Sequence, residues 1–193
     1  MRNALGTLIL ALGTAAVVSA APPSSDGLSL GGHEDAVTAR LLADVVEIAP
    51  GHPFQLGIEI RMAEGWHTYW ENGGDAGLPT TVEWTLPAGF EAGPIRWPVP
   101  HRYEEEGDLV TFGYADRVLL LTDVTPPERL GDEPVRIRGA VDWLQCKDIC
   151  IPGGAKVEIR LPVEEEARSA HEKILAAFAA ARERNRIDAG NRD

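Results

Sequence analysis

The sequence has few cysteines and few cationic residues. Among its 193 residues are two cysteines, and 18 lysines and arginines stand against 30 aspartates and glutamates, which gives a formal net charge of -12 at pH 7. Two cysteines do not make the dense disulfide framework of very small exported domains, so a hydrophobic core must hold the fold. The acidic balance argues against nucleic-acid binding, because that function needs clustered lysine and arginine to neutralise phosphates.

Long apolar runs are absent after the first twenty residues, and no later stretch reaches the ~20 residues that a membrane-spanning helix needs. The chain begins Met1-Arg2-Asn3, continues with an almost wholly apolar run to Val18 and then reaches small residues. This order is typical of a secretory signal peptide, and we place its cleavage after Ala20. An uncleaved membrane anchor is the alternative. We therefore expect an exported domain of about 170 residues, in a compartment where a disulfide can persist.

Alternation of apolar and polar residues dominates the rest of the chain. Four segments alternate with a period of two, which marks half-buried strands: 55–62, 82–86, 135–143 and 157–161. Residues 118–121 form a continuous apolar run, as expected for a central strand. Prolines and glycines predict a long irregular connection over residues 88–108 and a turn at Pro152-Gly153-Gly154. Short strands with regular turn signals predict an all-β, antiparallel β-sandwich.

The two ends of the chain depart from this pattern. Residues 21–36 are small, polar and rich in turn formers, so we expect a flexible N-terminal segment. Residues 163–184 are helix-prone, with acidic residues early and an apolar side that includes Phe178. We expect this helix to pack across the sandwich; docking onto a partner is the alternative. The expected organisation is a signal peptide (1–20), a flexible segment (21–36), the sandwich (37–162) and a C-terminal helix and tail (163–193).

Cys146 and Cys150 lie four residues apart, between two strand-like runs. In an extended strand they would be ~13 Å apart, whereas a disulfide needs Cα atoms within ~7 Å, so pairing requires the chain to bend between them. Closing so short a loop removes little unfolded-state entropy, on the order of 2 kcal/mol. A local pair is therefore a weak staple but a good exchange centre, because the second thiol can resolve a mixed disulfide.

Three interpretations of the cysteines follow. A redox-active pair is favoured, and a structural disulfide and a soft-metal site are the alternatives. Two thiolates suit Cu(I), whereas a tetrahedral zinc site would need two further ligands close by, and none is evident in the sequence. We expect no organic cofactor and no bound metal. No glycine-rich phosphate loop and no Ser-His-Asp arrangement stands out.

Three separated blocks of the sequence resemble a single family. They are Val141–Pro152, which holds the cysteines, Trp66–Pro79, and Leu86–Pro98 followed by Phe112–Tyr114. Together, over about residues 37–162, they resemble the N-terminal domain of the thiol:disulfide interchange protein DsbD, and most of all its version in the suppressor-of-copper-sensitivity protein ScsB. The resemblance implies an immunoglobulin-like β-sandwich in the periplasm, acting as a thiol:disulfide oxidoreductase of the protein-disulfide reductase type.

The resemblance also implies roles for the cysteines and for a cap. Cys150 would form the mixed disulfide with partners, and Cys146 would resolve it. In that family a cap loop covers the cysteines; the matching region here is about residues 101–114, with Tyr103 or Phe112 as the covering ring. The run of glutamates at 104–106 lengthens this loop relative to DsbD.

The aromatic strand from Trp66 to Trp70 is implied to flank the site, with Tyr69 as the best match and Trp66 beside it. His67 lies in the same strand, where a role in proton transfer and a role in packing are both open. The Glu104–Glu106 run is interpreted as a solvated loop, with steering of partners as the alternative.

The resemblance implies partners as well. DsbD and ScsB continue into a membrane electron-transfer domain and a thioredoxin-like domain, whereas this sequence ends after one expected helix. We therefore expect a separate membrane thiol reductase as electron donor. Periplasmic thioredoxin-like or other disulfide-containing proteins are the expected acceptors. The alternatives are a copper-handling protein that binds Cu(I) through both thiolates and a non-redox binding module with a structural disulfide.

Overall fold

The computed structural model describes residues 36–105 and 107–189. The expected signal peptide, the expected flexible segment up to residue 35, and Glu106 lie outside the described residues.

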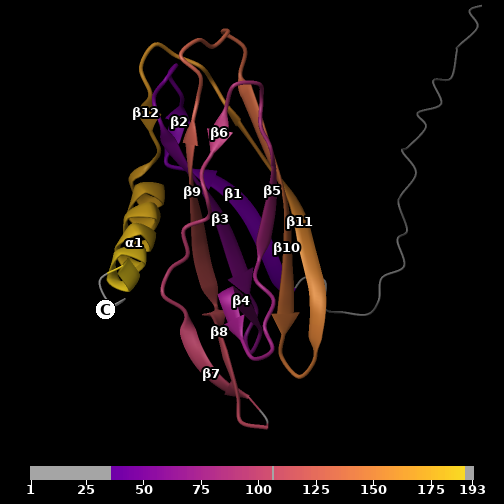
Figure 1. Cartoon of the computed structure of the whole chain (residues 1–193). Coiled ribbons are helices and arrows are strands. Elements are labelled where there is room, and N and C mark those ends of the chain that lie inside the picture. The colour runs from indigo at the N-terminus through magenta and orange to yellow at the C-terminus, as the bar shows by residue number, and fades with distance from the viewer. Residues whose placement is uncertain (1–35, 106, 190–193) are drawn as a thin grey trace, which may run out of the picture. The chain divides into compact units, whose positions relative to one another are not determined.

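Two antiparallel sheets face each other, as Figure 1 shows. The smaller sheet has the order β1 (Val37–Ala43), β3 (Phe54–Met62), β9 (Arg117–Thr125) and β6 (Glu91–Ala92). The larger sheet has the order β11 (Cys150–Leu161), β10 (Val135–Cys146), β4 (His67–Gly74), β8 (Leu109–Ala115) and β7 (His101–Glu105), with β5 (Thr81–Thr85) also paired to β10. Strands β2 (Val45–Glu47) and β12 (Arg168–Ser169) form a two-stranded ribbon, and helix α1 spans Glu172–Ala189.

The core lies between the inner faces of the two sheets, where the alternating apolar residues meet. Leu56, Ile58 and Ile60 of β3 belong to the same buried cluster as Ile137 and Val141 of β10. Each such side chain, once fully buried, contributes about 1.5–3 kcal/mol relative to exposure. The prediction of an all-β, immunoglobulin-like antiparallel sandwich with a C-terminal helix is confirmed.

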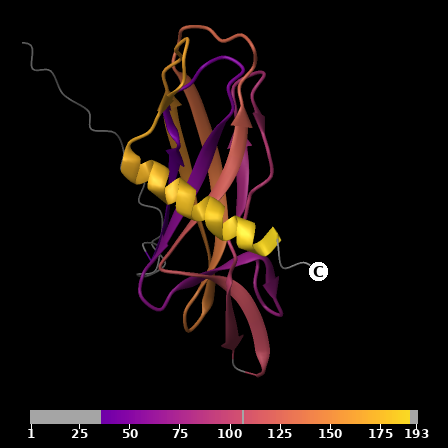
Figure 2. The same cartoon turned by 90° about the vertical axis from the view of Figure 1, so that its left-hand side faces the viewer.

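Strand β3 is buried on both faces, although its alternation predicts one face in solvent. Helix α1 covers part of the outer face, where Phe178 and Ala181 pack against Leu119 and Leu121 of β9. Figure 2 shows the helix lying obliquely across these strands. Gly57 makes the close approach possible, because a Cβ there would come within 3.0 Å of the Phe178 ring. The predicted packing of the helix across the sandwich is thereby observed.

Next to the helix, the outer face of β3 buries a carboxylate. Glu59 is 0% exposed and forms ion pairs with Arg40, Arg61 and Arg117, which come from β1, β3 and β9. Burial alone would raise the pKa of Glu59, but the hydrogen bonds from Arg40 and Arg61 and the charge on Arg117 outweigh it and lower the pKa. Such a charge is tolerated in the interior only because it is paired.

Two predicted local structures are wrong in their extent. Residues 101–105, expected in an irregular connection, form β7 and pair with β8, because no proline or glycine lies among these five residues. The helix begins at Glu172 and not near Val163. Val163 instead pairs with Ile48, and β12 pairs with β2, so the backbone of this segment is used by strand pairing.

We expect Phe178→Ala to destabilise the protein by about 3–5 kcal/mol, because it leaves a cavity between α1 and β9. Denaturant unfolding measures the change. Ala179→Gln, at an exposed position of the same helix, is the matched control and should cost well under ~1 kcal/mol. Equal effects of the two changes would show that the helix adds nothing to the stability of the sandwich.

Candidate functional site: a disulfide at one end of the sandwich

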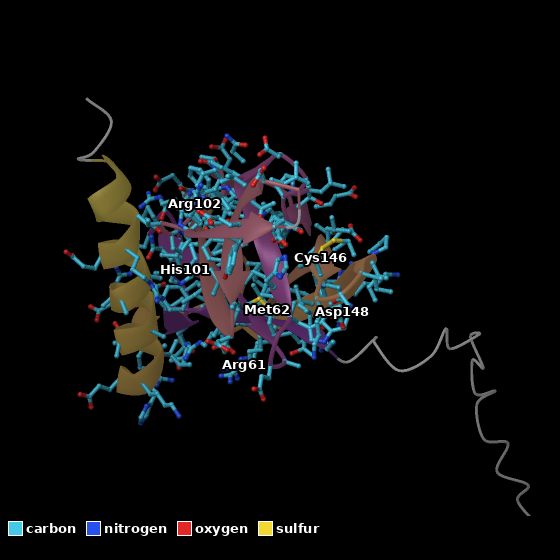
Figure 3. All side chains as sticks on the ribbon, turned by 90° about the horizontal axis from the view of Figure 1, so that it is seen from below. Arg61, Met62, His101, Arg102, Cys146 and Asp148 are labelled. Atoms are coloured by element: carbon cyan, nitrogen blue, oxygen red, sulfur yellow. A yellow bond between two sulfur atoms is a disulfide. The ribbon has the colours of Figure 1, made fainter. Side chains whose placement is uncertain are left out.

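Strands β10 and β11 form a long hairpin whose closing turn carries the cysteines. The pairing runs without interruption from Val135 opposite Leu161 to Cys146 opposite Cys150, and residues 147–149 make the connection. The structure joins the two cysteines in a disulfide with a Cα–Cα distance of 4.1 Å. Figure 3 shows this sulfur pair at the label of Cys146, on the other side of the molecule from α1. The bend required by the four-residue spacing is thus supplied by the hairpin turn.

The Pro152-Gly153-Gly154 segment lies inside β11, so the turn predicted there is wrong. Gly153 sits opposite Trp143, and a Cβ at Gly153 would approach the Trp143 Nε1 to 2.4 Å. The Trp143 indole also donates a 2.8 Å hydrogen bond to Gln145. Glycine is needed here for close packing against the indole, and Pro152 is tolerated because β11 is an edge strand.

Strand β4 brings Tyr69 to the sulfurs. Its first residues pair with the end of β10, so that His67 lies opposite Cys146. The Tyr69 hydroxyl donates to the Cys146 Sγ at 2.9 Å and lies 3.6 Å from the Cys150 Sγ. Tyr69 is only 3% exposed, and Gly77 packs so closely on its ring that a Cβ there would come within 2.3 Å. The sequence places Tyr69 near the site, and the structure gives it direct contact with both sulfurs.

The two cysteines differ in their access to solvent. Cys146 is 2% exposed, whereas Cys150 is an exposed residue. Ile149, next to Cys150, is also exposed. Of the two cysteines, Cys150 is therefore the one that faces solvent, while Cys146 is shielded.

The β7–β8 hairpin adds three groups to the same neighbourhood. The Tyr103 ring stacks on the His67 imidazole, with ring centroids 5.4 Å apart. The Glu105 Oε1 lies 3.9 Å from the His67 Nε2 and accepts a 3.1 Å hydrogen bond from Thr111. Sequence reasoning missed Glu105, because the register that turns it toward His67 depends on the hairpin and leaves no signal in a run of glutamates.

The other two residues expected at the site have contacts with the core and with Trp70, and their part in the site stays a prediction. Trp66 is buried in the core between the sheets. The Phe112 ring packs edge-on against Trp70, at a centroid distance of 6.3 Å. Among the contacts of the described rings, Tyr103 and not Phe112 is the one that connects the hairpin to His67 and Tyr69.

Burial and Glu105 set the electrostatics of the site. Burial lowers the pKa of His67, and the negative charge on Glu105 opposes this. Burial, together with the charge on Glu105, raises the pKa of Tyr69, so its hydroxyl stays protonated at neutral pH. Burial also raises the pKa of Tyr103. The disulfide is thus faced by a neutral hydroxyl and a largely neutral imidazole.

Within the described residues there is no group of three or more His, Cys, Asp or Glu side chains that could hold a metal ion. The Cu(I) alternative concerns the reduced cysteine pair and stays a prediction. The described part of the chain also holds no helix both long and apolar enough to cross a membrane.

The lowered pKa of His67 predicts a pH dependence of stability. Between the pKa of His67 in the folded protein and 6.5, its ordinary value, the unfolded state binds more protons. The folded state should therefore lose stability as the pH falls through this window, and His67→Phe should remove that loss.

An NMR titration of the His67 ring should give a midpoint below that of the same ring in urea. Glu105→Gln should lower the midpoint further, because the opposing charge is gone. A folded midpoint at or above the urea value would contradict the prediction.

The fold resembles that of a solved structure. The N-terminal periplasmic domain of ScsB from Proteus mirabilis aligns with a TM-score of 0.55 at 20% identity, over 77% of this chain and 52% of that one. The chain therefore spans about half the length of the ScsB chain that it matches. The N-terminal domain of DsbD from Neisseria meningitidis, in the reduced form, aligns with a TM-score of 0.41 at 13% identity, over 74% of this chain and 96% of that one. No curated protein matches the sequence significantly.

The sequence itself matches a family description. The family "Thiol:disulfide interchange protein DsbD, N-terminal" matches residues 38–162, which is more than half of the chain and includes both cysteines and all of β4. With the disulfide on the β10–β11 hairpin of an immunoglobulin-like sandwich, this match establishes that the chain belongs to the DsbD N-terminal domain family.

Proposed function

We propose that this chain is a periplasmic thiol:disulfide exchange module that relays electrons through the Cys146–Cys150 pair to exported partner proteins. The observation that carries the proposal is the asymmetry of the disulfide: Cys150 is exposed, whereas Cys146 is buried and accepts a hydrogen bond from Tyr69. Family membership supports thiol:disulfide exchange. The expected signal peptide and the periplasmic ScsB domain of the same fold support the location.

In the first half of the cycle, a donor thiolate attacks the accessible Cys150 Sγ. A bond forms between the donor sulfur and Cys150, the Cys146–Cys150 bond breaks, and the electron pair leaves on Cys146. The Tyr69 hydroxyl, 2.9 Å away, is placed to donate to that sulfur as its charge develops. A second donor thiol then releases the module as a dithiol.

In the second half, the Cys150 thiolate attacks the disulfide of an acceptor and forms a mixed disulfide. Cys146 then attacks Cys150, which restores the internal disulfide and releases the acceptor as a dithiol. Two electrons pass from donor to acceptor in each cycle. We propose a membrane thiol reductase as the donor and thioredoxin-like or other disulfide-containing exported proteins as acceptors.

The β7–β8 hairpin is proposed to act as the cap, with Tyr103 as its covering ring. The stacking of Tyr103 on His67, and the 3.9 Å approach of the Glu105 Oε1 to the His67 Nε2, support this assignment. In this assignment the hairpin covers His67, which lies opposite Cys146, while Cys150 stays open to a partner. The exposed Ile149 beside Cys150 offers such a partner an apolar contact.

The reduction potential of the pair tests the relay. We expect a value of about -180 to -270 mV, where exchange proteins lie, measured by thiol alkylation across a glutathione or dithiothreitol series. The Cys150→Ser variant, which cannot form the internal disulfide, gives the alkylation baseline. A value below about -300 mV is typical of a structural bond and would exclude the relay.

The assignment of Cys150 as the exchanging sulfur predicts unequal thiol reactivity. We expect the single thiol of Cys146→Ser to react with Ellman's disulfide reagent at least about tenfold faster than that of Cys150→Ser, because only Cys150 is accessible. In urea the two variants should react at similar rates. Equal rates in the folded proteins would contradict the assignment.

A further inference from the structure

His67 lies between the disulfide and the β7–β8 hairpin and connects them. It is paired across strands with Cys146 of β10 and with Ala115 of β8. The side chain is 13% exposed. Its Nε2 lies 3.2 Å from the Tyr69 hydroxyl and 3.9 Å from the Glu105 Oε1. One ring nitrogen therefore faces both the tyrosine that contacts the sulfurs and the carboxylate of the hairpin.

The Tyr69 hydroxyl has one hydrogen and three neighbours that can accept it: the nearer Cys146 Sγ, the Cys150 Sγ and the His67 Nε2. If it donates to the Cys146 Sγ, as the 2.9 Å geometry indicates, its oxygen is free to accept a hydrogen bond from the His67 Nε2–H. If the Nε2 carries no hydrogen, the imidazole becomes an acceptor and competes with sulfur for the tyrosine proton. The tautomer of His67 thus decides which way the tyrosine points.

Glu105 selects the tautomer that favours sulfur. Its carboxylate faces Nε2, and a negative charge at that position favours the hydrogen on Nε2 over the hydrogen on Nδ1. Thr111 holds the carboxylate by donating a hydrogen bond to it. The resulting chain runs from His67 Nε2–H to Tyr69 O–H to Cys146 Sγ, and each donor in such a chain strengthens the next.

This chain of hydrogen bonds stabilises the opened disulfide more than the closed one. A disulfide sulfur is a weak acceptor, whereas a thiolate accepts a charge-assisted hydrogen bond. Only an interaction that strengthens as charge develops on the Cys146 sulfur speeds bond cleavage. The Tyr69 hydroxyl is buried, so water does not substitute for it.

We propose that His67 is a positioning residue for the exchange reaction: it holds the Tyr69 proton toward the Cys146 Sγ and so stabilises Cys146 as the leaving thiolate. The biological meaning of this inference rests on the proposed function, whereas the effect on disulfide opening can be measured on the protein alone. In the step concerned, an external thiolate bonds to the Cys150 Sγ, the internal sulfur–sulfur bond breaks, and the electron pair remains on Cys146. No proton is required, and charge is conserved.

A double-mutant cycle on disulfide opening by dithiothreitol tests this. His67→Phe keeps a ring for stacking on Tyr103 but removes Nε2, and Tyr69→Phe removes only the hydroxyl. We expect Tyr69→Phe to open about tenfold more slowly than the wild type, per unit of dithiothreitol thiolate. His67→Phe should also open more slowly, by a smaller factor, because it keeps the hydroxyl and loses only the hydrogen bond donated to its oxygen. The double variant should open no more slowly than Tyr69→Phe alone, because His67 acts through the hydroxyl.

The second readout is the reduced fraction of the cysteine pair at equilibrium with glutathione. A residue that only contributes packing would not make the effect of His67→Phe depend on the presence of the Tyr69 hydroxyl. We expect the reduced fraction to fall in His67→Phe, which makes the pair more reducing, and to show no further fall when His67→Phe is added to Tyr69→Phe. His101→Phe is the matched control, since His101 also contacts the Tyr103 ring, edge-on at a centroid distance of 6.4 Å, and it should change the opening rate less than twofold.

Two results would overturn the inference. One is an unchanged opening rate in His67→Phe. The other is a full additional slowing when His67→Phe is placed in the Tyr69→Phe background. The two proposals fail separately. A reduction potential typical of structural disulfides would exclude the relay function, while non-additive effects of His67→Phe and Tyr69→Phe would still support the role of His67. Denaturant unfolding of each variant verifies that it is folded.

Discussion

The pairing of strand β10 along both of its edges is the constraint on which the site depends. On one edge it pairs with β11 over its whole length, which sets Cys146 opposite Cys150. On the other edge β5 pairs with its middle, and β4 pairs with its end. Because the last of these pairs sets His67 opposite Cys146, one strand end fixes the disulfide and the polar groups that face it.

The rest of the fold keeps this strand end rigid. A core drawn from both sheets holds β10 in place, and the outer face of the smaller sheet is closed by α1 and by the Glu59 ion-pair cluster. A buried carboxylate shared by three arginines ties together β1, β3 and β9, which the hydrophobic core holds from the other side. The chemistry can then be carried by a three-residue turn, since the framework around it does not have to move.

The sequence predicts what depends on local pattern. Period-two alternation identifies the core strands, and the spacing of Cys146 and Cys150 identifies a bent local pair. Prediction from the sequence fails where the same local pattern is compatible with two structures, a turn or a strand. Glycines at 153 and 154 signal a turn, yet they lie in β11, where the Trp143 indole occupies the space above Gly153 and the Asp142 carboxylate occupies the space above Gly154.

The contact between Glu105 and His67 could not be predicted for a different reason. It depends on the register of β7 against β8 and of β8 against β4, both of which are set by long-range pairing. A run of three glutamates contains no sign of which one faces inward. The start of α1 was missed on similar grounds, because the partner that keeps Val163 extended is Ile48, far away in the sequence.

The choice of a neutral donor beside the sulfurs has a physical reason. A cation held next to the pair would be a fixed charge, present in the disulfide state as well as beside the thiolate of the reduced state. Lys147 is adjacent in sequence and could supply one. Its side chain instead lies along Gly65, with Nζ 3.5 Å from the Glu64 carbonyl oxygen. The buried Tyr69 hydroxyl costs little while the disulfide is closed and gains strength only when Cys146 becomes negative. In the proposed exchange function, the pair passes through both redox states in each cycle, and a donor of this kind suits both states better than a fixed charge does.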